Sequence, residues 1–193
     1  MVGAMTQIIK QMDSDDLVLR ARTDTDALGR LYELYYERIF RFCVHRLFSK
    51  EAAEDVTSAV FLEVARKIRT FTGRTEADFR NWLYAIAANK ANAYIRKTAR
   101  RKKLFAEAAG PMTAKNAGRT SHTPKLDWPT IYQAIAKLSP KHQTIITLRF
   151  FENMEFEQIA KIIKARPATV RVTLHRILKK LRNHLQSVVD GGK

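Results

Sequence analysis

Apolar residues in the first part of the chain recur at intervals of three and four, which is the spacing of one face of an α-helix. This pattern predicts a short helix over residues 14–22 and a longer one over residues 26–47. Ser49 stands where it can cap a third helix, which Gly73 is expected to end. The residues predicted to face inward on this third helix are Ala53, Val56, Val60, Val64 and Ile68.

Two later helices carry start signals of their own. Thr75 and Asp78 have the spacing of a capping box, so a fourth helix is predicted to start there and to continue into a basic stretch. Ser139 and Pro140 supply a cap and a first-turn proline for a helix that runs to about residue 151. No stretch alternates with a period of two for long, so the chain is predicted to be all-α.

A small, polar segment over residues 111–127 separates the two sets of helices. It has no apolar period, which is typical of a linker. We therefore predict two small helical domains joined by a flexible linker, a division that is consistent with the length of the chain. The predicted bounds are 13–104 for the first domain, 105–127 for the linker and 128–188 for the second domain.

Within the second domain, two helical patterns meet at a four-residue break, residues 164–167. Arg166 takes the cap position of the second helix and Pro167 its first turn. Residues expected to face inward on that helix are Val170, Leu174, Ile177, Leu178 and Leu181, and those expected outward are Thr169, Arg171, Val172, Thr173, His175, Arg176 and Lys179. This arrangement, over about 156–175, is typical of a helix-turn-helix whose second helix enters the major groove of DNA.

The charge of the chain supports a nucleic-acid partner. There are 35 Lys and Arg against 19 Asp and Glu, for a net charge of +16. Phosphate polymers and anionic membranes both attract such a protein. Residues 80–103 hold eight basic residues and no acidic residue, and residues 161–182 also hold eight basic residues and no acidic one. DNA is favoured over a membrane surface, because the apolar side of the last helix has a partner helix available.

Other classes of function find little support. The chain has one cysteine, Cys43, and no Cys and His spacing typical of a metal site. No run approaches the roughly 20 apolar residues of a membrane span, and residues 1–16 lack the apolar core of a signal peptide. No phosphate-binding glycine loop or pair of catalytic carboxylates is found. We expect a cytoplasmic protein that is not an enzyme, with no membrane insertion, metal or cofactor.

The stretch LSPKHQTIITLRFFENMEFEQIAKIIKARPATVRVTLHRILKKLR resembles region 4 of bacterial RNA polymerase sigma factors, most closely the extracytoplasmic-function (ECF) group. The residues that match this pattern in kind are Leu138, Pro140, Leu148, Arg149, Ile159, Ala160, Thr169, Val170, Leu174, Arg176 and Leu181. Lys164 replaces the usual turn glycine, so we expect either a different turn or strain at a left-handed position. Arg166 replaces the usual cap serine.

The first domain resembles the same family independently. LYELYYERIFRFCVHRL is similar to region 2.1, AAEDVTSAVFLEVARKI to region 2.2, and FRNWLYAIAANKANAYIRKTARRK to regions 2.3 and 2.4. The positions that depart from the family pattern are Ser58, Ala59, Ala65, Ala88 and Ala93. Two sets of motifs therefore occur in the family's order with a linker between them, which is far more specific than a helix-turn-helix alone.

This resemblance implies a sigma factor that binds core RNA polymerase, directs it to promoters and promotes initiation. It implies that core polymerase contacts Glu54, Asp55, Phe61 and Leu62, although a core position for Phe61 is favoured because buried Phe is the default. It implies contacts with the −10 element by Arg80, Asn89, Lys90, Arg96, Lys97 and Arg100. It implies contacts with the −35 element by Arg166, Thr169, Arg171, Thr173, His175, Arg176 and Lys179. An anti-sigma partner is also expected.

Three other interpretations remain. The first is a stand-alone helix-turn-helix regulator that binds an operator without polymerase. The second is an enzyme that acts on nucleic acid, and the third is a structural coat without promoter preference. Helix-turn-helix corners also occur in proteins that never touch DNA. Dependence on core polymerase separates the sigma-factor interpretation from the other three.

Overall fold

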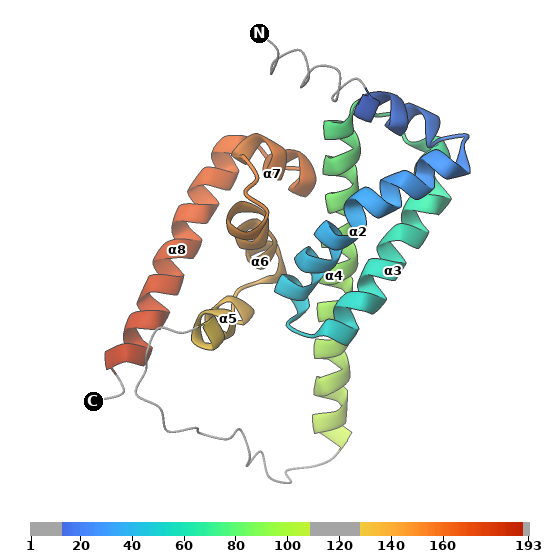
Figure 1. The fold of residues 1–193 in the computed structure, drawn as a ribbon. Helices are drawn as coiled ribbons and strands as arrows, with labels where there is room; N and C mark the ends of the chain where they lie inside the picture. The colour runs from blue at the N-terminus through green and yellow to red at the C-terminus, as the bar shows by residue number, and fades with distance from the viewer. Residues whose placement is uncertain (1–12, 109–127, 191–193) are drawn as a thin grey trace.

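The computed structural model describes residues 13–108 and 128–190, with side chains over 13–101 and 128–187. Every regular element in these ranges is helical, which confirms the all-α prediction. Residues 109–127, most of the expected linker, lie outside the described residues. The elements form two groups, which we call the N-terminal unit (residues 13–108) and the C-terminal unit (residues 128–190) (Figure 1).

The N-terminal unit begins with helical residues 13–20 and continues with three long helices that pack on one another. These are α2 (Thr25–Leu47), α3 (Lys50–Lys67) and α4 (Glu76–Ala108), with a short 3₁₀ turn, η1 (Ile68–Thr70), after α3. The α-helical geometry of α3 therefore ends at Lys67, six residues before Gly73. Helix α4 continues to Ala108 and so includes the first residues of the segment expected to be a linker.

Local capping explains where these helices begin. The Ser49 hydroxyl accepts a hydrogen bond from the Ala52 amide at 3.2 Å. The Asp78 amide donates to the Thr75 hydroxyl at 3.1 Å, and the Thr75 amide donates to the Asp78 carboxylate at 3.2 Å. Both predicted caps are thus confirmed, and they satisfy amide groups that would otherwise lack partners at the helix starts. The five residues predicted to face inward from the third helix are all buried.

The C-terminal unit consists of shorter elements. They are α5 (Trp128–Ala136), α6 (Pro140–Ile146), the π-helical turn η2 (Thr147–Phe151), α7 (Phe156–Ile163) and α8 (Pro167–Asp190). Ser139 caps α6 as predicted, by accepting from the His142 amide at 3.4 Å. The helix predicted to reach residue 151 instead widens at Thr147, whose carbonyl accepts from the Glu152 amide at 3.2 Å.

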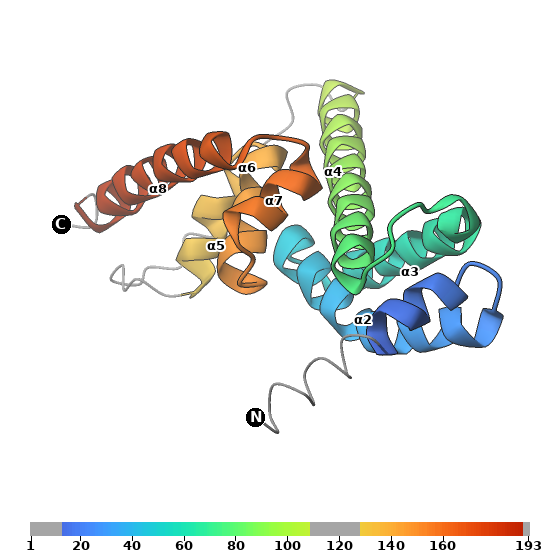
Figure 2. The ribbon, with the colours of Figure 1, turned by 90° about the horizontal axis from the view of Figure 1, so that it is seen from above.

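The two units pack against each other. Helix α4 contacts α6 and α7, and α2 contacts η2. Seen from above, α7 lies beside α4 (Figure 2). A continuous cluster of buried apolar residues runs through both units, so burial of apolar surface contributes to the contact between them. We call this packing of the two units the closed arrangement.

Candidate DNA-binding surfaces

The turn between α7 and α8 has the geometry of a helix-turn-helix corner. Lys164 takes a left-handed conformation with φ 52°, and its amide donates to the carbonyls of Ala160 and Lys161. The expected strain at a left-handed position is therefore present, since a side chain disfavours this conformation. The Arg166 carbonyl accepts from the Val170 amide at 3.1 Å, which confirms Arg166 as the cap of α8.

One side of α8 packs on the C-terminal unit. Val170, Leu174 and Ile177 are buried, and Leu181 is half-buried, as predicted. Leu178 was predicted to face inward but is 41% exposed. Its position on the helix lies at the edge of the apolar stripe, which runs through Val170, Leu174 and Ile177.

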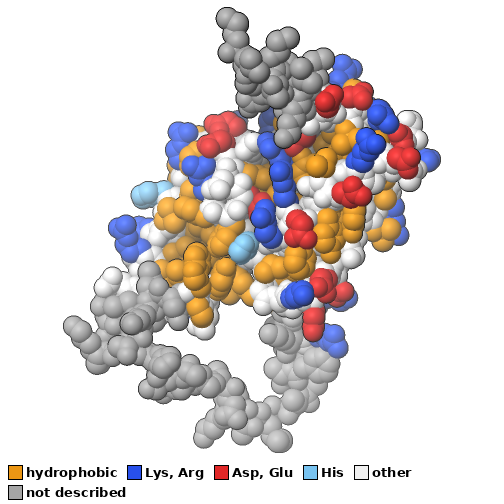
Figure 3. Space-filling view, viewed as in Figure 1, with side chains coloured by type: hydrophobic (Ala, Val, Ile, Leu, Met, Phe, Trp, Pro, Cys, Tyr) orange, Lys and Arg blue, Asp and Glu red, His pale blue; other side chains and the backbone are white. Residues whose placement is uncertain are grey.

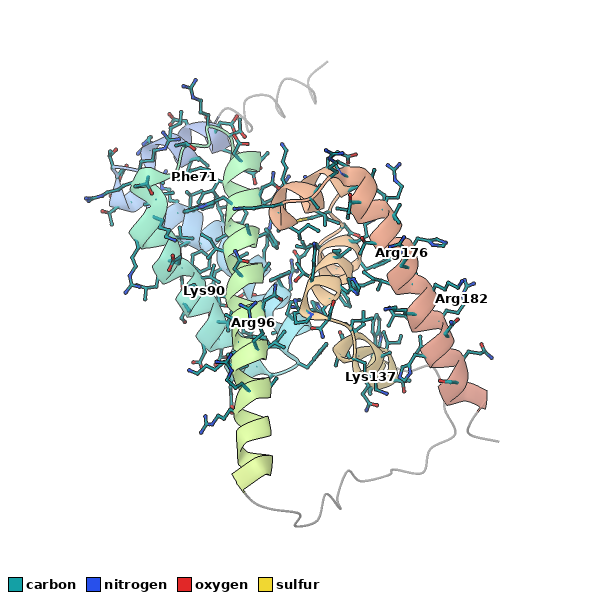
Figure 4. The ribbon with its side chains drawn as sticks, turned by 180° about the vertical axis from the view of Figure 1, so that it is seen from behind. Phe71, Lys90, Arg96, Lys137, Arg176 and Arg182 are labelled. Atoms are coloured by element: carbon teal, nitrogen blue, oxygen red, sulfur yellow. The ribbon has the colours of Figure 1, made fainter. Side chains whose placement is uncertain are left out.

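The opposite side of α8 presents the residues predicted to contact the −35 element. Arg176 and the neighbouring Arg182 point away from the rest of the molecule (Figure 4). Thr173 is half-buried, so its side chain is less accessible to DNA than the pattern predicted. The other predicted residues are exposed: Arg166, Thr169, Arg171, His175, Arg176 and Lys179. The arrangement gives a basic helix face that DNA can reach.

An aromatic support for this face was not predicted. The Phe156 ring, at the start of α7, lies under two guanidinium groups: that of Arg149 at 5.0 Å and that of Arg171 at 5.2 Å. Arg149 also donates to the Met154 carbonyl at 2.8 Å. A guanidinium held over an aromatic face loses less freedom when it binds a ligand. The sequence does not show that these three residues meet.

Helix α4 carries the residues predicted to contact the −10 element, but they do not share one face. Asn89, Arg96 and Arg100 follow one another on one side, with Lys97 beside them, because residues at intervals of three, four and seven align along a helix. All four are exposed. Arg80 precedes Asn89 by nine residues, or two and a half turns, so it lies on the opposite side of α4.

Lys90 is engaged by the protein itself. Its ammonium lies 3.1 Å from the carboxylate of Glu63 on α3, and Lys67 lies 2.6 Å from the same group. These hydrogen bonds, that of Lys67 first and then that of Lys90, lower the pKa of Glu63 to about 2. Lys90 projects from the side of α4 that borders α3, whereas Arg96 lies further along the helix (Figure 4). A DNA phosphate would have to compete with Glu63 for Lys90.

The closed arrangement covers a strip of α4 between Arg80 and Asn89. Tyr84, on this strip, donates a hydrogen bond to Glu152 of the C-terminal unit at 2.5 Å. Asn89 lines a hollow at one edge of the strip, together with Lys141 and residues 162–164. Arg80 lines another hollow at the opposite edge. The C-terminal unit thus crowds two of the six predicted −10 contacts, Arg80 and Asn89.

Arg46 joins the two units at a buried position. Its side chain, from the end of α2, donates to Gln143 and to the Pro140 carbonyl of α6, the latter at 3.2 Å. It also donates to Asn92 of α4 at 2.6 Å. Arg46 is 1% exposed, and burial lowers its pKa to about 10, which leaves it charged at neutral pH. A buried charge needs such partners, so the contact depends on them.

The predicted core-polymerase surface lies on α3, away from the C-terminal unit (Figure 1). Glu54 and Asp55 are exposed, and Leu62 is 53% exposed. Phe61 is half-buried, with its ring 4.8 Å from that of Tyr32. Tyr32 is itself exposed, so the surface extends onto α2, which the sequence did not indicate.

Two further observations bear on other classes of site. Over residues 13–108 and 128–190, no three His, Cys, Asp or Glu side chains are grouped so that they could hold a metal ion. Within the same part of the chain, no helix is long and apolar enough to cross a membrane.

Comparison with known families matches both units. The pattern of Sigma-70 region 2 matches residues 31–101, and that of Sigma-70, region 4 matches residues 130–181. Together the two matches cover more than half of the chain. They occur in the order expected from the motifs, and they leave the segment between the units unmatched.

Individual relatives agree with these matches. The chain is 29% identical over 170 residues to the ECF RNA polymerase sigma factor BldN of Streptomyces coelicolor, covering 86% of this chain and 63% of that protein. It is 29% identical to the RNA polymerase sigma factor YlaC of Bacillus subtilis, covering 83% of this chain and 92% of that protein. The sigma factor RpoE of Bartonella quintana, solved in complex with the anti-sigma factor NepR, has the same fold, with a TM-score of 0.59 and 19% identity over 82% of this chain and 96% of that one.

Proposed function

The chain belongs to the sigma-70 family of RNA polymerase sigma factors, in its extracytoplasmic-function group, and we propose how its two units divide the work of a sigma factor. Such a protein directs core RNA polymerase to promoters and begins transcription there. The proposal rests mainly on one observation. Two basic surfaces, on α4 and on α8, belong to separate helical units of one chain.

Helix α8 reads the −35 element from the major groove. Its exposed side, from Arg166 to Lys179, offers guanidinium groups for guanine or phosphate and a threonine for base edges or methyl groups. Arg171 is the main contact, because the Phe156 ring orients its guanidinium before DNA arrives. His175 and Arg176 follow on the exposed side. Thr173 is half-buried, so only the exposed part of its side chain contacts DNA.

Helix α4 binds the −10 element. Asn89, Arg96 and Arg100 form the continuous contact, with Lys97 beside them, and Asn89 can read a base edge. Lys90 joins them once a phosphate displaces Glu63. Arg80, on the opposite side of the helix, contributes only after the C-terminal unit has moved away from α4. The full −10 surface therefore forms in an open arrangement of the two units.

The exposed surface of α3 docks on core polymerase. Glu54 and Asp55 supply the charge, and Leu62 and Tyr32 supply apolar surface. Phe61 contributes mainly by holding Tyr32 in place. An apolar centre with charged groups around it is the usual composition of a protein interface. We further propose that an anti-sigma factor holds this protein inactive, since the fold is shared with a sigma factor solved in complex with one.

Two single substitutions test whether α8 binds the −35 element and α4 the −10 element. Arg171→Ala should cost about 1–3 kcal/mol of base discrimination at the −35 element. The loss should be seen as weaker transcription from promoters that carry this element. Lys137→Ala is the matched control, because Lys137 is an exposed lysine of the C-terminal unit that lies beside α5 and outside α8 (Figure 4). Asn89→Ala should relax sequence preference at the −10 element alone. The proposal fails if both substitutions alter the same promoter element, or if DNA binding is tight and specific without core polymerase.

A further inference from the structure

A cleft lies where α2, α4 and the segment between η2 and α7 meet. It has a volume of about 410 Å³ and is walled by Arg38 and Arg41 from α2 and by Arg80 from α4. On the face shown in Figure 3, basic side chains gather along the boundary between the two units. The residues that complete the lining on the C-terminal side are Phe151, Glu152, Asn153, Met154 and Gln158. Both units therefore build the cleft.

The charges in this cleft do not balance. Glu152 supplies the one carboxylate of the lining, against three guanidinium groups, so the cleft keeps two excess positive charges even when Glu152 is ionised. That carboxylate is partly buried, which raises its pKa, and it accepts its hydrogen bond from Tyr84. Among the described side chains, no carboxylate lies within 4.0 Å of the guanidinium groups of Arg38, Arg41 or Arg80.

The arginines also have unused hydrogen-bond donors. The Nε atom of Arg80 is buried and has no hydrogen-bond partner. Arg38 is held over the Tyr35 ring at 5.6 Å, which fixes its position at the wall of the cleft. Guanidinium groups match the oxygens of phosphate groups in pairs, and such charge-assisted hydrogen bonds are stronger than neutral ones. An oxyanion with two or more negative charges would satisfy both the charge and the donors.

We propose that this cleft binds a small phosphate-class oxyanion, either free phosphate or pyrophosphate or the polyphosphate of a nucleotide. Because its walls come from both units, the cleft exists only in the closed arrangement. The ligand would therefore favour that arrangement, in proportion to its preference for the closed over the open form. The further consequence rests on the proposed function: a bound oxyanion would keep Arg80 away from promoter DNA.

Isothermal titration calorimetry of the full chain with pyrophosphate tests the binding itself. The buffer is free of phosphate, and sodium chloride keeps the ionic strength constant. We expect binding at one site per chain, weakened about tenfold by Arg38→Gln and by Arg41→Gln, since each removes a charge-assisted hydrogen bond. Arg30→Gln is the matched control, because it removes the same charge from α2 outside the cleft lining and should change nothing.

Further variants and ligands in the same experiment identify the ligand and separate a loss of binding from a loss of folding. Arg41→Lys keeps the charge without the planar donor pair, so it should bind with intermediate affinity. Arg46→Ala, which loosens the two units, should weaken binding although Arg46 does not line the cleft. Tripolyphosphate and a nucleoside triphosphate are compared: equal affinities identify a site for the free oxyanion, and tighter nucleotide binding identifies a nucleotide site.

The absence of binding heat with pyrophosphate would overturn the proposal, as would equal weakening by Arg30→Gln. The calorimetry uses neither polymerase nor DNA. A negative result would therefore leave the assignment as a sigma factor intact, and failure of the transcription assay would leave the oxyanion site intact.

Discussion

Arg46 of α2 donates a hydrogen bond to Gln143 of α6, and this bond joins residues 97 positions apart in the sequence, on opposite sides of the boundary between the two units. The Arg46 side chain is 1% exposed. Gln143 is fixed in turn by donating to the carbonyls of Ala136 and Leu138, at 3.0 and 2.9 Å. The closed arrangement is thus held by a buried polar contact as well as by apolar packing.

Replacing Arg46 by Ala should open the closed arrangement. The substitution leaves Gln143, Asn92 and the Pro140 carbonyl without their donor, which should lower the free energy of unfolding by about 2–3 kcal/mol. Urea unfolding measures the stability, and small-angle X-ray scattering measures the separation of the units. Arg66→Ala, at an exposed position of α3, should change stability by less than about 0.5 kcal/mol. An unchanged scattering profile for Arg46→Ala would contradict this account of the contact.

Leu62→Asp should separate polymerase binding from stability. Leu62 is more than half exposed, so a carboxylate there costs the fold little, but it should weaken binding to core polymerase by about tenfold or more. Phe61→Ala should instead lower stability, because the ring packs against Tyr32. Binding is measured by fluorescence anisotropy with labelled protein, with Leu19→Asp as the exposed control outside α3. Equal affinities for Leu62→Asp and Leu19→Asp would remove Leu62 from the interface.

Glu63→Gln should increase promoter affinity. It releases Lys90 from an ion pair, and because a surface pair of this kind contributes little, holoenzyme affinity should rise only about threefold. The pKa of Glu63 is lowered to about 2, so the pair is kept above that pH and is lost only as the pH falls through it. The increase in promoter affinity caused by Glu63→Gln should therefore be the same from about pH 6 to pH 8. Glu37→Gln makes the same change of charge on α2, and an equal gain from it would show a general charge effect instead.

Lys164→Gly should stabilise the chain. Lys164 has φ 52°, where a side chain costs about 1–2 kcal/mol, and glycine removes that cost but loses part of the gain through its greater freedom when unfolded. The expected net gain is about 0.5–1 kcal/mol, seen as a higher melting temperature in a calorimetric scan. Lys161→Gly, inside α7, should instead destabilise by about 1 kcal/mol. A loss of stability in both variants would show that the side chain of Lys164 contributes more than its backbone strain costs.

Features that depend on near neighbours were predictable from the sequence. The caps at Ser49, at Thr75 with Asp78 and at Ser139 were predicted correctly, because each hydrogen bond spans three residues. The left-handed strain at Lys164 followed from the family pattern. The π-helical turn after Ile146 was not predicted, because its i to i+5 hydrogen bond does not change the spacing of apolar residues in the sequence.

Features that depend on distant residues were not predictable. The sequence does not show that Lys90 meets Glu63, or that Arg171 shares the Phe156 ring with Arg149. Arg80 and Asn89 were grouped as −10 contacts because of the resemblance to sigma region 2. Helical geometry places them on opposite sides of α4, and the strip between them is where the C-terminal unit packs. The closed arrangement itself depends on such contacts between the units.

We propose that this chain gives promoter specificity to core RNA polymerase through two separate DNA-binding surfaces. The most direct measurement is transcription of genomic DNA by core polymerase of the same host with and without the purified chain, followed by sequencing of transcript 5′ ends. We expect new, focused starts that share two upstream elements and that disappear without the chain. Starts that do not change when the chain is added, together with specific operator binding by the free protein, would contradict the claim and indicate a stand-alone regulator.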